Sequence, residues 1–132
     1  MGIEEIAEQW IQADKQAFQE GNFDALEQLE SPNIVIHSAP VPGTIGFKEH
    51  KEHILKVREE VSDLQQEFEY LTGDGNVFAI SFKQSFTAKV EIPIAPAGST
   101  VNIDSLFVLR CENDKTVEIW MNPNITLNQQ PI

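Results

Sequence analysis

The spacing of apolar residues changes from helical to strand-like near residue 64, and this change most constrains the fold. Before it, apolar residues recur every three or four positions, and after it they alternate with polar residues. Helices followed by consecutive strands indicate an α+β domain rather than alternating βαβ units. With 132 residues the chain suits a single domain, 1–132, that can bury a core without disulfides.

Two helices are expected within the first thirty residues. The apolar stripe of the first, over 3–20, consists of Ile3, Ile6, Ala7, Trp10, Ala17 and Phe18. Gly21 ends this helix, and a second short one covers 23–30. Asp14 lies on the same stripe, so its carboxylate needs a partner or has a raised pKa; the alternative is that it reaches water at the edge of the stripe.

A short strand, a Pro/Gly loop and a third helix follow. Alternation over the strand 34–38 places Ile34 and Ile36 on one face and His37 on the other. The helix opens at Gly46, and its stripe consists of Phe47, His50, Ile54, Val57 and Val61. Because His37, His50 and Asp14 fall on faces that should otherwise be apolar, we expect them to share a pocket.

The second half predicts four antiparallel strands. Leu64, Gln66, Phe68 and Tyr70 alternate with polar neighbours, and the turn GDGN at 73–76 leads into a return strand over 77–89. Strands over 100–111 and 116–122 follow.

The strand over 100–111 is apolar on both faces. Helices can cover only one face of the sheet, and Leu106 and Val108 lie on the other. This pattern predicts a homodimer packed sheet against sheet; a local apolar patch on a monomer is the alternative.

Charge and cysteine content narrow the function classes. A formal net charge of −12 disfavours nucleic acid and anionic membranes as partners. The first residues lack the basic start and apolar run of a secretory signal, so a cytoplasmic location is expected. Cys111 is isolated and is interpreted as a buried apolar residue. His50 and His53 are three apart rather than four, so neither a metal nor another cofactor is predicted.

The order of these elements resembles the nuclear transport factor 2-like superfamily, which includes ketosteroid isomerases and SnoaL-like polyketide cyclases. The resemblance covers nearly the whole chain. It is carried by Gly21-Asn22-Phe23-Asp24-Ala25, Ile34-Val35-Ile36-His37, Gly46-Phe47 and Val117-Glu118-Ile119-Trp120. It implies a cone-shaped, curved antiparallel sheet wrapped around three N-terminal helices, with a ligand pocket inside.

The catalytic residues of both enzyme groups are replaced in this sequence. His37 corresponds to the isomerase general base at the end of the first strand, and Phe107 corresponds to the acid that stabilises the oxyanion. The isomerase oxyanion tyrosine falls near Asp14. Where the cyclases carry an acid after the last strand, this chain has Met121-Asn122-Pro123-Asn124.

An enzyme of this kind would take a proton beside a carbonyl, with His37 as general base. Asp14 would hold the imidazole tautomer, or His50 would donate to a developing oxyanion. The ligand would be a small apolar molecule, contacted by Trp10, Phe18, Phe107, Trp120, Asn122 and Asn124. A structural role for His37, bonded to a loop carbonyl, is the alternative. The competing function is a non-catalytic ligand-binding or protein-interaction module.

Overall fold

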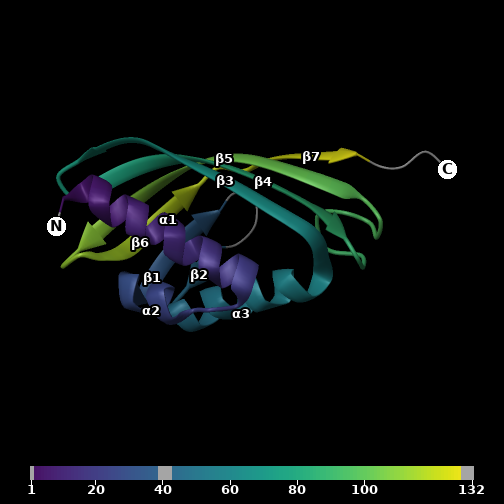
Figure 1. Cartoon of the computed structure of the whole chain (residues 1–132), viewed down its shortest axis with the longest axis horizontal. Helices are drawn as coiled ribbons and strands as arrows, with labels where there is room; N and C mark the ends of the chain where they lie inside the picture. Colours follow the sequence, from purple (N-terminus) through teal and green to yellow (C-terminus); the bar gives the residue numbers. More distant parts are fainter. Residues whose placement is uncertain (1, 39–42, 129–132) are drawn as a thin grey trace.

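Three helices lie on one side of a single curved sheet (Figure 1). The structure is a computed structural model that describes residues 2–38 and 43–128. The helices are α1 (Ile3–Glu20), α2 (Asp24–Leu29) and α3 (Phe47–Glu60). The strands are β1 (Glu30–Ser38), β2 (Thr44–Ile45), β3 (Val61–Asp74), β4 (Val77–Ala88), β5 (Thr100–Glu112), β6 (Lys115–Met121) and β7 (Asn124–Asn128). The predicted α+β class is confirmed.

The sheet has the strand order β2-β1-β6-β5-β4-β3, and β7 pairs with β5 beyond the end of β6. The four consecutive strands β3 to β6 are antiparallel, as predicted. One pairing departs from the antiparallel pattern, because β1 runs parallel to β6. A parallel pairing needs a long crossover connection. Here the connection contains α3 and the four strands β2 to β5, so residues far apart in the sequence become neighbours.

The first helix crosses the concave side of the sheet and runs antiparallel to β3 (Figure 1). Near its start, Ile3 approaches Gly73 so closely that a Cβ atom on Gly73 would lie 2.8 Å from the Ile3 side chain. Near its end, the Gln19 side chain donates to the Leu64 carbonyl at 3.3 Å. These contacts fix the position of α1 along the whole length of β3.

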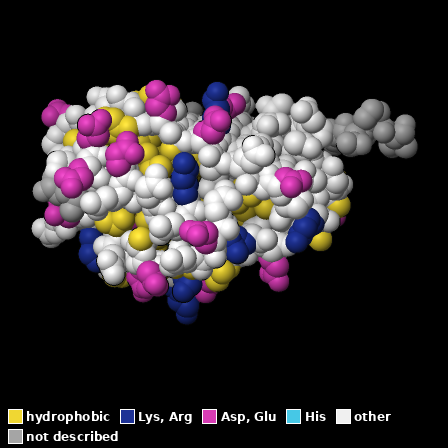
Figure 2. Space-filling view, viewed as in Figure 1, with side chains coloured by type: hydrophobic (Ala, Val, Ile, Leu, Met, Phe, Trp, Pro, Cys, Tyr) yellow, Lys and Arg dark blue, Asp and Glu magenta, His cyan; other side chains and the backbone are white. Residues whose placement is uncertain are grey.

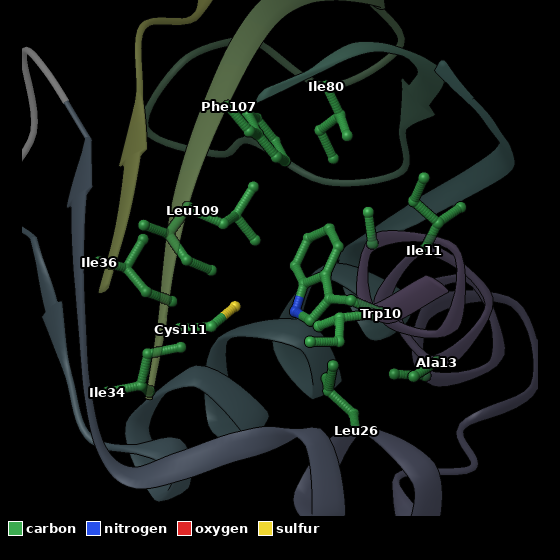
Figure 3. Close-up of a cluster of buried hydrophobic side chains, with 14 of the residues drawn as sticks. Trp10, Ile11, Ala13, Leu26, Ile34, Ile36, Ile80, Phe107, Leu109 and Cys111 are labelled. Atoms are coloured by element: carbon green, nitrogen blue, oxygen red, sulfur yellow. The ribbon is translucent and has the colours of Figure 1, made fainter. Parts of the chain in front are cut away.

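The core between helices and sheet is centred on Trp10. Figure 3 shows its indole ring between Phe107 and Leu109 of the sheet and Leu26 of α2. The ring meets Phe68 and Phe107 edge to face, with centroids 6.2 and 6.3 Å away. A second, smaller core at the other end of the sheet contains Val61, Phe86, Ala95 and Val101.

Several element boundaries differ from the sequence prediction. Glu30 was expected to end a helix, but it begins β1 and pairs with Thr116 of β6. Val61 was placed on the third helix, but it begins β3. The strands β2 and β7 were not predicted. Both are short, and their backbone hydrogen bonds depend on partners that local periodicity does not show.

Acidic side chains are spread singly over the face that carries α1, among a few basic ones, rather than gathered in one block (Figure 2). This distribution fits the interpretation of the negative charge as a solvated surface. None of the helices in 2–38 and 43–128 is long and apolar enough to cross a membrane.

Candidate functional site

A buried polar cluster joins α1, β1 and α3. The Glu30 side chain is fully buried, and each of its oxygens has a partner. The indole Nε1–H of Trp10 donates to Oε2 at 2.9 Å, and Nδ1 of His50 lies 2.8 Å from Oε1. A carboxylate without water is stable only when it is paired and hydrogen-bonded, and here Trp10 and His50 provide both.

Asp14 is the third ionisable group of this cluster and is 4% exposed. Burial raises its pKa to about 7; the charge of His50 opposes this rise and the charge of Glu30 adds to it. For His50, burial lowers the pKa, but the charge and hydrogen bond of Glu30 outweigh this, so the pKa is raised overall. The predicted raised pKa of Asp14 is therefore found, and its proton is exchangeable near neutral pH.

The structure does not bring His37 to this cluster, so the prediction of a shared pocket is wrong for His37. Ile34 and Ile36 occupy the core face of β1, and alternation turns His37 to the opposite, outer face. There its ring stacks on Trp120 with centroids 5.6 Å apart. Its Nε2 lies 2.6 Å from the Glu118 carboxylate, and this hydrogen bond lowers the pKa of Glu118. His37 is thus bound to a side chain rather than to a loop carbonyl.

The aromatic residues expected to line a pocket fall into three places. Trp10 and Phe107 are buried in the main core, where Phe107 also packs on Phe82 at 4.8 Å between centroids. Trp120 lies on the outer face and is 39% exposed. Phe18 is half-buried at the end of α1. The space under the sheet near Trp10 is therefore filled by side chains, and the expectation of an open apolar pocket there is wrong.

The two asparagines predicted to contact a ligand lie where β6 ends and β7 begins. The backbone N–H of Asn122 donates to Ser105 Oγ at 3.1 Å, just before Pro123. Asn124 is exposed and pairs with Asp104 of β5. Their contact with a ligand stays a prediction.

Two shallow depressions flank the buried cluster. One, of about 190 Å³, lies between the ends of α1 and α3 and the start of β3, and is lined by Phe18, Gln19, Arg58, Val61, Ser62, Asp63 and Leu64. The other, of about 210 Å³, is lined by Glu27, Glu30, Pro32, Phe47 and Lys48. The first borders the helical turn that follows Asp14, and the second borders Glu30.

Arg58 gives the first depression its polar wall. Its Nη1 donates to the Phe18 carbonyl at the end of α1, at 2.6 Å. Gly21, with φ of +70°, ends the helix beside the guanidinium, and a Cβ there would lie 3.2 Å from it. The positive charge of Arg58 therefore caps the negative end of the helix and holds this rim in place.

Although Asp14, Glu30 and His50 share a cluster, no group of three or more His, Cys, Asp and Glu side chains in the described part of the chain could hold a metal ion. Cys111 is buried in the main core, as interpreted from the sequence. Burial raises the pKa of its thiol, so its thiolate form is disfavoured.

Glu30 is the functional candidate that the sequence did not reveal. Its burial depends on the parallel pairing of β1 with β6, which begins at Glu30 and Thr116. Local pattern alone places it at the polar end of a short helix. The position of His37, by contrast, could have been read from alternation, since Ile34 and Ile36 are apolar and His37 faces away from them.

The family model for the SnoaL-like polyketide cyclase matches residues 8–130. A search among curated proteins found no match.

Solved structures with the same fold share few residues with this chain. TsrD from Streptomyces laurentii has a TM-score of 0.78 and 17% identity, with 91% of this chain and 89% of that chain covered. An LEH-like epoxide hydrolase from M. tuberculosis has a TM-score of 0.70 and 11% identity, over 91% and 84% of the two chains. The epoxide hydrolase/cyclase-like enzyme SalBIII, described for pyran ring formation in salinomycin, has a TM-score of 0.71 and 15% identity, over 92% of each chain. At these identities the likeness shows the fold.

Proposed function

Because the chain belongs to the SnoaL-like polyketide cyclase family, we propose that it is an isomerase or cyclase that acts on a small, largely apolar carbonyl compound by proton transfer through Asp14. The observation that carries the proposal is the burial of Asp14 beside the Glu30–His50 pair. The proposed base is therefore Asp14 and not His37, the base expected from the sequence, because His37 lies on the outer face of the sheet.

Ionisable groups are costly to bury, and the cost is compensated only in part by pairing. This domain buries three of them between α1, β1 and α3, with exposed fractions of 4% for Asp14, 0% for Glu30 and 9% for His50. Buried groups with a shifted pKa, here Asp14 and His50, are concentrated at functional sites. A pKa of about 7 suits Asp14 for both taking and returning a proton at neutral pH.

The proposed chemistry needs one proton and no outside reagent. The Asp14 carboxylate takes a hydrogen from the carbon beside the carbonyl, so the C–H bond breaks, an O–H bond forms on Asp14, and the electron pair moves to the carbonyl oxygen as an enolate. Return of the proton to a different carbon isomerises the compound. Attack of the enolate carbon on a second carbonyl of the same molecule closes a ring, and the resulting alkoxide oxygen takes the proton back from Asp14. Glu30 raises the pKa of His50, and a positive charge on His50 favours the ionised form of Asp14.

The depression beside Phe18 is the proposed entrance. Phe18 is one helical turn beyond Asp14, so a compound seated there lies one turn from the carboxylate. The volume of about 190 Å³ is smaller than a typical drug-sized site. Binding therefore requires Phe18 to move, which its half-buried position at the end of the helix allows.

The experiment is hydrogen exchange of 2-tetralone, a compact bicyclic ketone, in D2O followed by ¹H NMR. The protein should accelerate loss of the α-proton signals over buffer alone, and Asp14→Asn should lower this acceleration at least ~100-fold. Asp24→Asn, on the exposed surface of α2, is the matched control. An Asp14→Asn variant with the wild-type exchange rate would overturn the proposal, and so would a wild-type protein that does not accelerate the exchange.

The second candidate function is a non-catalytic module that binds the same kind of compound. It is favoured by the loss of the catalytic acids of both enzyme groups, whose positions are occupied here by Phe107 and by Asn122-Pro123-Asn124. A module of this kind would bind 2-tetralone without accelerating its exchange.

We further propose that a second copy of the chain covers the outer face of the sheet. Leu106, Val108 and Trp120 expose 58%, 37% and 39% of their surface there, on the neighbouring strands β5 and β6. Val108 pairs directly with Trp120, so the patch is continuous across the two strands.

A further inference from the structure

Two glutamine side chains face each other on the concave side of the sheet. Gln66 of β3 and Gln84 of β4 are register partners, and Gln66 Nε2 donates to Gln84 Oε1 at 3.3 Å. Gln66 shares a face with Leu64 and Phe68, and Gln84 lies between Phe82 and Phe86, which are buried. Both amides therefore point to the side that the helices cover.

The carbonyl oxygen of Gln66 has no hydrogen-bond partner. Within residues 2–38 and 43–128 it is the one buried side-chain nitrogen or oxygen left unpaired. With its nitrogen engaged by Gln84, Gln66 presents this oxygen, a hydrogen-bond acceptor, and leaving such an atom unpaired is unfavourable.

The glutamine pair marks a polar boundary between the two apolar cores. Two residues away along the strands in one direction, Phe68 and Phe82 belong to the main core. Two residues away in the other direction, Leu64 and Phe86 pack in the smaller core. Ser105, the partner of Phe82 on β5, is also buried. The concave face therefore carries a band of three polar residues, the pair Gln66 and Gln84 and, diagonally on β5, Ser105; the direct partner of Gln84 on β5 is Ile103.

This band lies at the level of Asp14. Trp10 contacts Phe68, and Phe18 lines the same depression as Leu64. Later residues of α1 therefore lie beside earlier residues of β3. The four residues from Trp10 to Asp14 advance roughly 6 Å along a helix. The two residues from Phe68 to Gln66 advance roughly 6.6 Å along a strand. Asp14 and Gln66 are therefore matched in position between these two contacts.

We propose that Gln66 is a specificity-determining residue that accepts a hydrogen bond from a hydroxyl group of an otherwise apolar ligand. The inference rests on the proposed function, because it places the ligand between α1 and β3 beside Asp14. It adds the class of compound, which carries a hydroxyl donor in addition to the carbonyl. The Phe18 depression borders Leu64, the inner-face neighbour of Gln66, and so lies next to this position.

The test compares the binding of 2-naphthol and 2-methoxynaphthalene by isothermal titration calorimetry. The two compounds share a ring system, but only 2-naphthol donates a hydrogen bond. Wild-type protein should bind 2-naphthol roughly tenfold more tightly. Gln66→Leu should remove this preference while its affinity for 2-methoxynaphthalene stays within about threefold. Gln65→Leu, on the exposed face of the same strand, should keep the preference.

Equal affinities for the two compounds in the wild type, no binding of either, or a preference that survives Gln66→Leu would each overturn the inference. Circular dichroism of each variant establishes that it is folded. The 2-tetralone exchange rate separates the two proposals. If exchange depends on Asp14 but the protein does not prefer 2-naphthol, only the role of Gln66 is rejected and proton transfer through Asp14 is kept. A naphthol preference without exchange rejects proton transfer and keeps the role of Gln66.

Discussion

His50 Nδ1 lies 2.8 Å from the buried Oε1 of Glu30 and joins the third helix to the first residue of β1. The second oxygen of the same carboxylate accepts the indole N–H of Trp10, which extends the connection to the first helix. Asp14, one turn beyond Trp10, completes a set of ionisable groups inside an apolar domain. The proposed chemistry and the first three predictions below depend on this set.

Glu30→Gln should lower the free energy of unfolding at pH 7 by about 3 kcal/mol, because removing one member of a buried pair leaves His50 uncompensated. Urea denaturation measures the change. NMR titration of His50 should show its pKa falling, since the carboxylate that raises it is gone. Glu27→Gln, at an exposed position of α2, should change the unfolding free energy by less than about 0.5 kcal/mol. Equal effects of the two substitutions would mean that Glu30 is not paired as described.

Asp14 should make the protein less stable as pH rises. Its pKa is about 7 in the folded chain and 3.8 as a free group, so the folded state binds the proton more tightly. The contribution to stability is therefore fully present below pH 4 and is lost as pH rises through 7, by an amount on the order of 4 kcal/mol. The facing groups are Glu30 and His50, and the raised pKa of His50 acts in the same direction.

Asp14→Asn should flatten this dependence. Urea denaturation at pH 4 and pH 8 should show a clearly smaller loss of stability for the variant than for the wild type. The comparison uses the difference between the two pH values, so a constant cost of burying the amide cancels. Parallel pH profiles for the two proteins would be incompatible with a buried, titrating Asp14.

His37→Ala should leave the 2-tetralone exchange within about twofold of wild type, because the imidazole lies on the outer face with Glu118 and Trp120. The pair with Glu118 is partly exposed, and such pairs contribute little to stability. A loss of exchange comparable to that of Asp14→Asn would restore His37 as the base and contradict the assignment to Asp14.

Leu106→Lys should convert the proposed dimer to a monomer in sedimentation equilibrium, since it places a charge in the exposed apolar patch on β5. Leu71→Lys, at an exposed residue of β3, should leave the association unchanged. A wild-type protein that is monomeric at tens of micromolar would contradict the proposed interface.

The sequence predicted the fold well where one face of an element is apolar over its whole length. The stripe of α1 and the alternation of β3 to β5 each repeat a local signal many times. The site was predicted in part: Asp14 and His50 were identified because each interrupts an apolar stripe. Glu30 and Gln66 were not, because their significance comes from partners that lie 20 and 18 residues away across the fold.

The filled interior could not be foreseen for a different reason. Periodicity shows that Trp10, Phe82 and Phe107 face inward, but it does not show whether inward-facing rings line a cavity or fill it. The distances of 4.8 to 6.3 Å between ring centroids are those of direct packing. The open space therefore lies at the rim, beside Phe18.

A ¹³C NMR titration of the Asp14 side-chain carboxyl in the folded protein tests the account most directly. We expect its chemical shift to follow a midpoint near pH 7, because burial raises the pKa of this carboxyl group. A midpoint near 4, the value of an ordinary exposed aspartate, would show that Asp14 is not held as described and would remove the basis of the proposed proton transfer.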